Sequence, residues 1–230
     1  MKTTAIIPAA GFGLRMSANV PKQYLKLQNR PILAMTAEKF DSCDLIDGII
    51  LVVPAGDVDL CRKDIVEKYN LKKVTAVVPG GERRQDSVRA GIEATDGKYD
   101  AVLIHDGVRP FVSRKTIIHA INALKENRAI ITAVPARDTI KKIGEGGYVV
   151  KTYDRRHLCL VQTPQVFRYK DIFNAHMKAL KEGWDEVTDD ALLMEKMNIP
   201  VKIIPGSDKN IKITTPSDLE YAEFLLNKGI

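Results

Sequence analysis

The sequence has few cysteines and no long apolar run, and each of these scarcities excludes a class of protein. Cys43, Cys61 and Cys159 lie far apart among 230 residues and form no CxxC pair, so neither a disulfide framework nor a zinc site is expected. No stretch approaches the roughly 18 apolar residues of a membrane-spanning helix. Pro8 and Gly11 interrupt the N-terminus before a signal peptide could develop. We therefore expect a cytoplasmic protein that does not enter a membrane.

The charge of the chain is positive but dispersed. The net charge is +6, and 35 basic residues are interspersed with 29 acidic ones rather than gathered into a tract. This pattern does not indicate a nucleic-acid-binding surface, whereas a small polyanionic substrate would account for the excess. The length and an apolar fraction of 45% predict one domain over residues 1–230 with a sizeable core.

Short apolar runs alternate with helical patterns through the first part of the chain. Expected strands cover residues 3–7, 48–53, 74–78, 100–105 and 129–134. Helical patterns begin near Pro31, Asp57, Arg83 and Arg114. Several of the strands are rich in Val and Ile, as expected for strands that are covered on both faces. The alternation predicts an α/β fold with a mainly parallel sheet and flanking helices.

The alternation stops after Pro135. Two β-like stretches between residues 136 and 156 are joined by Glu145-Gly146-Gly147, which predicts a β-hairpin arm protruding from the sheet. Helices are expected next at 169–181 and 187–197, followed by a strand in VKIIPG and a second extended segment, NIKIT. The run TPSD, from Thr215, predicts the start of a closing helix.

The loop after the first expected strand is typical of a nucleotide-binding loop without matching the two commonest motifs. A dinucleotide-binding turn needs a third glycine where Met16 stands, and a Walker A loop needs Ser or Thr after its lysine, whereas Lys22 precedes Gln23. The small residues that follow Pro8 let backbone amides approach a base and phosphates, and Arg15 and Lys22 supply positive charge. The alternative is a turn with two solvated cations.

A second candidate site follows the apolar run AVLI. Asp106 lies where the carboxyl ends of parallel strands place ligands, and its carboxylate can hold Mg²⁺ on phosphate oxygens. The alternative is a turn cap before Gly107. His105 is more typical of an oriented residue at a strand end than of a catalyst. Arg109 is expected near bound phosphates, or else in a surface ion pair.

Seven sequence blocks occur in order along the chain: PAAGFGLRM with PKQYL, GGERRQDSV, HDGVRPF, RDTIKK, QTPQVF, TDDALLME and NIKITTPSDLEYAE. Together they closely resemble the 2-C-methyl-D-erythritol 4-phosphate cytidylyltransferase family over nearly the whole length. The resemblance implies a Rossmann-like nucleotidyltransferase fold and transfer of CMP from CTP to methylerythritol phosphate with release of pyrophosphate. It also implies a homodimer in which the arm crosses to the partner subunit. Such phosphate chemistry is expected to use Mg²⁺ or another divalent cation.

The resemblance assigns roles to individual residues of this sequence. The chemistry of phosphoryl transfer, which needs positive charge and a metal, makes Arg15 and Lys22 the expected catalytic cations and Asp106 the expected metal ligand. The nucleotide-binding residues are Pro8, Ala9, Ala10, Gly11, Gly13, Gly81, Glu82 and Ser87. The resemblance implies that Thr139, Arg155, Thr163 and Lys212 position the sugar-alcohol phosphate, and Arg109 joins them because it follows Asp106 by three residues. The alternation of NIKIT sends Lys212 to the face opposite its two Ile neighbours, as in a strand.

Structural alternatives remain for several of these residues. Ser87 can cap the helix that begins near it, and Arg155 beside Arg156 can form a solvated basic pair on the arm. The acids of TDDALLME are explained more simply by a Thr188 helix cap with acids in the first turn than by a metal site.

Three other functions compete with this reading. Ribitol-5-phosphate cytidylyltransferases share the PKQ, HD, TPQ and NIKITTP blocks, but the opening PAA and the RDTIKK arm favour the isoprenoid enzyme. Met16 disfavours an NAD-dependent oxidoreductase. A nucleotide-sensing module without chemistry is disfavoured because Arg15, Lys22, Asp106 and Lys212 are all present.

Overall fold

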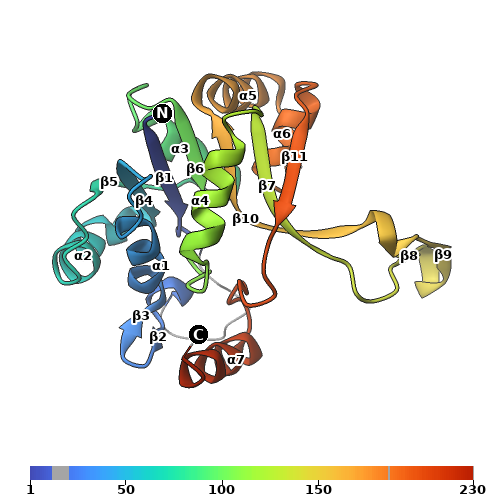
Figure 1. The fold of residues 1–230 in the computed structure, drawn as a ribbon, viewed down its shortest axis with the longest axis horizontal. Helices are drawn as coiled ribbons and strands as arrows, with labels where there is room; N and C mark the ends of the chain where they lie inside the picture. The colour runs from blue at the N-terminus through green and yellow to red at the C-terminus, as the bar shows by residue number, and fades with distance from the viewer. Residues whose placement is uncertain (12–20, 186, 230) are drawn as a thin grey trace.

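A seven-stranded sheet forms the centre of the molecule. The computed structural model describes residues 1–11, 21–185 and 187–229, and the strand order is β11-β7-β10-β6-β1-β4-β5 (Figure 1). The strands are β1 (Thr3–Pro8), β4 (Gly48–Val53), β5 (Val74–Pro79), β6 (Ala101–Ile104), β7 (Ala129–Pro135), β10 (Cys159–Arg168) and β11 (Val201–Pro205). Every pairing is parallel except the two that β10 makes with β6 and β7. The predicted mainly parallel sheet is therefore confirmed.

Helices cover both faces of this sheet. They are α1 (Ile32–Asp41), α2 (Val58–Cys61), α3 (Arg84–Glu93), α4 (Arg114–Ala123), α5 (Tyr169–Glu182) and α6 (Asp190–Lys196). The last helix, α7 (Pro216–Asn227), packs in a separate core. One core packs side chains of α1, α2 and α4 against the sheet, and the other packs α3, α5 and α6 against the opposite face. No helix among the described residues is long and apolar enough to cross a bilayer.

The apolar strands divide their side chains between the two cores because successive residues of a strand point to opposite faces. In β1, Ala5 and Ile7 lie in the core under α1, whereas Ile6 lies in the core under α3. All three are fully buried, and burying a side chain such as Ile contributes about 1.5–3 kcal/mol. The continuous apolar runs read from the sequence thus correspond to strands that are covered on both sides.

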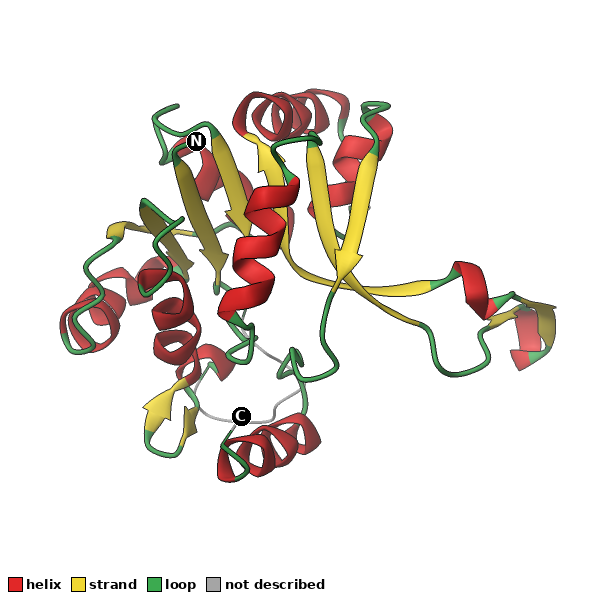
Figure 2. Ribbon diagram, in the orientation of Figure 1, coloured by secondary structure: helices red, strands yellow, loops and turns green. Residues whose placement is uncertain are grey.

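The strand β10 is the main feature of the sheet that the sequence analysis did not separate from the arm. It runs antiparallel between β6 and β7. Its first three residues, Cys159–Val161, are exposed, whereas Gln162–Phe167 are buried. One long strand therefore leaves the arm and enters the middle of the sheet (Figure 2).

The predicted hairpin arm is confirmed. The strands β8 (Lys141–Ile143) and β9 (Val149–Thr152) pair antiparallel and are joined by a turn over Glu145–Gly147. Gly146 and Gly147 have φ of 68° and 81°, a backbone conformation that glycine adopts most easily. The hairpin projects away from the sheet (Figure 1), and all residues of both strands are exposed.

Two local predictions need correction. Residues 211–214 form no strand; the N–H of Ile213 donates to the carbonyl of Val108 at 3.0 Å, and Ile213 packs in a third core beside α7. The helix cap before α6 is Asp189 rather than Thr188, because Asp189 Oδ1 accepts the N–H of Leu192 at 3.1 Å. A carboxylate at this position also complements the positive end of the helix dipole.

Candidate active site

A cavity of about 500 Å³ opens at the carboxyl ends of β1, β5 and β6, and we refer to it as the first cavity. Its lining includes ten residues singled out in the sequence: Pro8, Ala9, Ala10, Gly11, Lys22, Gly81, Glu82, Ser87, Asp106 and Lys212. Gln23, Arg83, Arg84, Val108 and Thr214 complete the lining. Four separate sequence blocks therefore meet at one edge of the sheet, as expected where parallel strands end. Two predicted residues, Gly13 and Arg15, lie outside the described part of the chain.

The wall of the first cavity depends on a close approach between two loops. A Cβ at Gly80 would lie 2.4 Å from Ala10 Cβ and 2.7 Å from Ser87 Oγ, so only glycine fits there without displacement. Ser87 Oγ accepts the N–H of Gly81 at 3.2 Å. The helix α3 is capped by Arg83, so the alternative that Ser87 is the helix cap is wrong. Ser87 instead holds the glycine turn beside the cavity.

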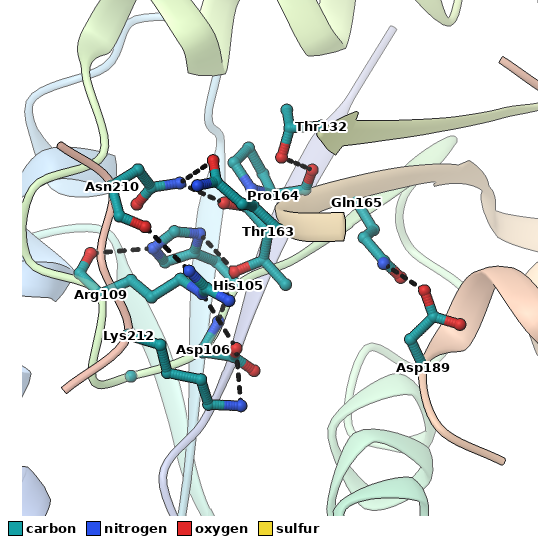
Figure 3. Close-up of polar contacts among 12 residues, drawn as sticks. His105, Asp106, Arg109, Thr132, Thr163, Pro164, Gln165, Asp189, Asn210 and Lys212 are labelled. Atoms are coloured by element: carbon teal, nitrogen blue, oxygen red, sulfur yellow. Dashed lines mark hydrogen bonds and ion pairs between the residues drawn. The ribbon is translucent and has the colours of Figure 1, made fainter. Parts of the chain in front are cut away.

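Asp106 is the electrostatic centre of the site. Its carboxylate lies 3.2 Å from Arg84 Nε, 3.1 Å from Arg109 Nε and 3.0 Å from Lys212 Nζ; Figure 3 shows the last two contacts. Burial would raise the pKa of Asp106, but the three cations outweigh it and hold the pKa well below its usual range. The carboxylate is therefore ionised. Arg109 is only 9% exposed, so the alternative of a surface ion pair is wrong for this residue.

Arg84 links Asp106 to a second buried carboxylate that the sequence analysis did not identify. Its Nη1 lies 2.7 Å from Asp190 Oδ2, and Asp190 Oδ1 lies 3.2 Å from His176 Nε2. Burial raises the pKa of Asp190, but Arg84 and His176 together outweigh this effect, so the pKa lies below its usual value. An arginine in the first turn of a helix is unfavourable unless acids surround it, and this was the available sequence signal.

His105 and Thr163 fix the backbone of Asp106. Thr163 Oγ1 accepts the N–H of Asp106 at 3.1 Å and lies 3.0 Å from His105 Nδ1 (Figure 3). His105 Nε2 lies 3.1 Å from the carbonyl of Arg109, which can only accept a hydrogen bond. Burial lowers the pKa of His105 to about 4, so the ring is neutral, with Nε2 as its donor and Nδ1 as the acceptor of the Thr163 hydroxyl proton. His105 is thus an oriented strand-end residue, as predicted.

A second cavity, of about 440 Å³, lies on the other side of Asp106. It shares Arg84, Asp106 and Lys212 with the first cavity. Its remaining lining includes Arg109, Gln162, Thr163, Gln165, Thr188, Asp189 and Glu195. Arg109, Thr163 and Lys212, predicted to position the sugar-alcohol phosphate, therefore all lie on this cavity. The two cavities meet at a group of cations around one carboxylate.

Two predicted residues lie away from both cavities. Thr139 and Arg155 are exposed on the arm and line neither cavity. Arg155 Nη1 donates to the carbonyl of Arg137 at 2.6 Å, so Arg155 is held against the base of the arm rather than fully solvated. The structure does not bring these side chains to the active site of their own chain.

Asp106 is the residue predicted to hold a divalent metal. Among the described residues, no three His, Cys, Asp or Glu side chains are grouped so that they could hold a metal ion. Mg²⁺ commonly uses one or two protein carboxylates and takes its other ligands from water and substrate phosphates. Asp106 fits that arrangement, because its carboxylate lines both cavities. Among the acids of TDDALLME, Asp189 is the cap of α6.

The fold and the site define a Rossmann-like α/β protein of the nucleotidyltransferase type. The chain belongs to the 2-C-methyl-D-erythritol 4-phosphate cytidylyltransferase family, whose model matches residues 3–228. A protein of that name from Geobacter metallireducens is 46% identical over 100% of both chains, and one from Syntrophus aciditrophicus is 45% identical over 99% of this chain and 97% of its own. The predicted family is confirmed.

Solved structures agree with this assignment. The crystal structure of 4-diphosphocytidyl-2C-methyl-D-erythritol synthase from Anaerococcus prevotii has a TM-score of 0.86 and 39% identity, and it covers 98% of this chain and 96% of its own. The cytidylyltransferase structure from Thermus thermophilus has a TM-score of 0.81 and 30% identity over 99% of this chain and all of its own. The predicted fold class is confirmed.

Proposed function

We propose that this protein transfers CMP from CTP to 2-C-methyl-D-erythritol 4-phosphate, giving 4-diphosphocytidyl-2-C-methyl-D-erythritol and pyrophosphate. The observation that carries this proposal is the meeting of two cavities at Asp106, Arg84 and Lys212. A reaction between two phosphorylated molecules needs two adjoining binding sites with cations between them, because anions must be brought together. Membership of the family supports the same reaction.

The first cavity is the proposed CTP site. Its small residues from Pro8 to Gly11 leave room for backbone groups to approach the nucleotide, and the turn held by Ser87 provides Gly81 and Glu82 for the base. Gly13 and Arg15 complete this proposal from the sequence alone. The second cavity is the proposed site of the sugar-alcohol phosphate.

In the proposed reaction, an oxygen of the sugar-alcohol phosphate attacks the α-phosphorus of CTP, the bond to the β-phosphate oxygen breaks, and pyrophosphate leaves. Negative charge builds on the oxygens around the α-phosphorus. Lys22 lies at the first cavity and Lys212 at both cavities, where their ammonium groups can stabilise this charge. Asp106 would hold Mg²⁺, which supplies neutralisation of the phosphate charge when bound.

The arm supports a homodimeric enzyme. Ile143, Tyr148, Val149 and Val150 are 59–79% exposed on it, and exposed apolar groups of this size mark an interaction surface. We propose that the arm lies against a second copy of the chain and delivers Thr139 and Arg155 to that copy's second cavity. The enzyme is proposed to be cytoplasmic and to use residues 1–230 as one catalytic domain, since β1 and β11 belong to the same sheet.

A cytidylyl-transfer assay tests the proposed function. Pyrophosphate release is measured with CTP and either 2-C-methyl-D-erythritol 4-phosphate or ribitol 5-phosphate, and then with UTP or ATP in place of CTP. We expect a strong preference for CTP and the methylerythritol substrate. Faster turnover with ribitol 5-phosphate would assign the alternative function, and equal use of ATP would refute the cytidine assignment.

A further inference from the structure

Gln165 lines the second cavity, and one end of its amide is hydrogen-bonded whereas the other is not. Its side chain lies in β10, is 1% exposed and lines the cavity together with Asp189. Gln165 Nε2 donates to Asp189 Oδ2 at 2.7 Å (Figure 3). Its Oε1 has no hydrogen-bond partner within the described parts of the chain. A buried acceptor without a partner is uncommon and requires an explanation.

The orientation of the Gln165 amide is set by its neighbour. A carboxylate can only accept hydrogen bonds, so the NH₂ group of Gln165 must face Asp189. Asp189 is itself fixed, because its Oδ1 accepts the N–H of Leu192 at 3.1 Å as the cap of α6. The remaining oxygen, Gln165 Oε1, is therefore left as a buried hydrogen-bond acceptor in a residue that lines the second cavity.

The second cavity has a polarity that matches a sugar-alcohol phosphate. One part of its wall carries Arg84, Arg109 and Lys212, which suit an anion. Another part carries the acceptors of Gln165 and Asp189, which suit hydroxyl donors. In Figure 3 the Gln165–Asp189 pair lies apart from the Asp106 group. A four-carbon polyol with a phosphate at one end and hydroxyls along the rest is complementary to this wall. Its phosphate matches the cations, and its hydroxyl donors match the acceptors.

We propose that Gln165 Oε1 accepts a hydrogen bond from a hydroxyl group of the sugar-alcohol substrate, and that Asp189 is a positioning residue that fixes the direction of this amide. The proposal rests on the proposed function and adds a residue pair that selects the acceptor substrate by its hydroxyls. A site built to bind a hydroxyl rejects an analogue without it, because the buried acceptor is then left unpaired.

The first test compares substrate analogues in the wild type and in Gln165→Leu. The analogues are three forms of 2-C-methyl-D-erythritol 4-phosphate, each lacking the hydroxyl at C1, C2 or C3. Gln165→Leu should raise the KM for the full substrate about tenfold, equivalent to about 1.4 kcal/mol, and leave the KM for CTP unchanged. One analogue should show a similar loss with the wild type and no further loss with Gln165→Leu.

The second test reverses the amide. Asp189→Asn retains an oxygen to cap α6 but presents an NH₂ group to Gln165, which turns Oε1 toward residue 189 and places Nε2 at the cavity. The KM for the sugar-alcohol phosphate should rise, and Asp189→Asn should add nothing in the Gln165→Leu background. Ser113→Ala is the matched control, because it removes the Ser113 cap of α4, which accepts the N–H of Thr116 at 3.0 Å.

The outcomes are distinct. An unchanged KM in both variants, an equal rise in the KM values of both substrates, or additive effects in the double variant would overturn the proposal. A lowered melting temperature with the analogue preference retained would assign the pair a purely structural role and overturn it as well. Absence of turnover by the wild type with any sugar-alcohol phosphate would refute the proposed function instead.

Discussion

Replacement of Asp106 by asparagine tests the electrostatic centre of the site. Asp106→Asn keeps the shape of the side chain but removes the charge that faces Arg84, Arg109 and Lys212. Removing one partner of a buried ion pair typically costs about 3–5 kcal/mol. Arg84 retains Asp190, and Arg109 Nη1 still donates to the carbonyl of Asn210 at 2.8 Å. Since Lys212 can turn to solvent, we expect the free energy of unfolding to fall by about 3 kcal/mol, at the lower end of this range.

The loss should depend on pH in a defined direction. Because folding lowers the pKa of Asp106, its contribution to stability is complete above the pKa of an unfolded aspartate, about 3.9, and declines as the pH falls below it. The difference in the free energy of unfolding between the wild type and Asp106→Asn should therefore be full at pH 7 and smaller near about pH 3.5. Urea unfolding at both pH values measures it.

A surface pair provides the control for this experiment. Asp171→Asn removes an ion pair with Arg128, whose side chain is 57% exposed, and solvent screens such a pair, so its removal should change the stability much less. An Asp106→Asn variant as stable as the wild type would refute the ion-pair argument.

The cytidylyl-transfer assay tests the metal. Asp106→Asn should lose most of its activity, and EDTA should abolish turnover of the wild type. Full activity in EDTA would refute the role of Asp106 as a metal ligand.

Three further experiments give separate expectations. Gly80→Ala should destabilise the fold and raise the KM for CTP, because the new Cβ would lie 2.4 Å from Ala10 Cβ. Urea unfolding and initial rates measure the two effects. An unchanged KM for CTP would contradict the inferred close approach of the two loops. Lys22→Ala should mainly lower kcat, whereas Lys212→Ala should also raise the KM for the sugar-alcohol phosphate. If Lys22→Ala altered only KM, Lys22 would have no role in stabilising the transition state. Arg155→Ala and Lys22→Ala should each be nearly inactive alone. After subunit exchange, about half of the dimers are heterodimers, and each heterodimer has one intact site of two. The mixture should therefore recover roughly one quarter of wild-type activity. If verified heterodimers recovered no activity, Arg155 would act in the active site of its own subunit, and the shared-site proposal would be refuted.

Ten of the fifteen residues that line the first cavity could be predicted from the sequence. Its walls are short loops that directly follow apolar strands, and the carboxyl ends of parallel strands lie along one edge. Residues near Ala9, Gly81 and Asp106 therefore had to lie close together once the strands were recognised. The hairpin arm was equally visible, because Gly146 and Gly147 interrupt two β-like stretches.

The sequence by itself determined the alternation of strands and helices, the order of the motifs and the family, since each depends on residues that are near one another in the chain. Only the tertiary structure decided that β10 enters the sheet antiparallel, and that Lys212 reaches Asp106 from a loop rather than from a strand. It also paired Arg84 with Asp190, 106 residues away, and Gln165 with Asp189, 24 residues away. These contacts join groups on separate elements, so they exist only where packing against a common sheet brings the elements together.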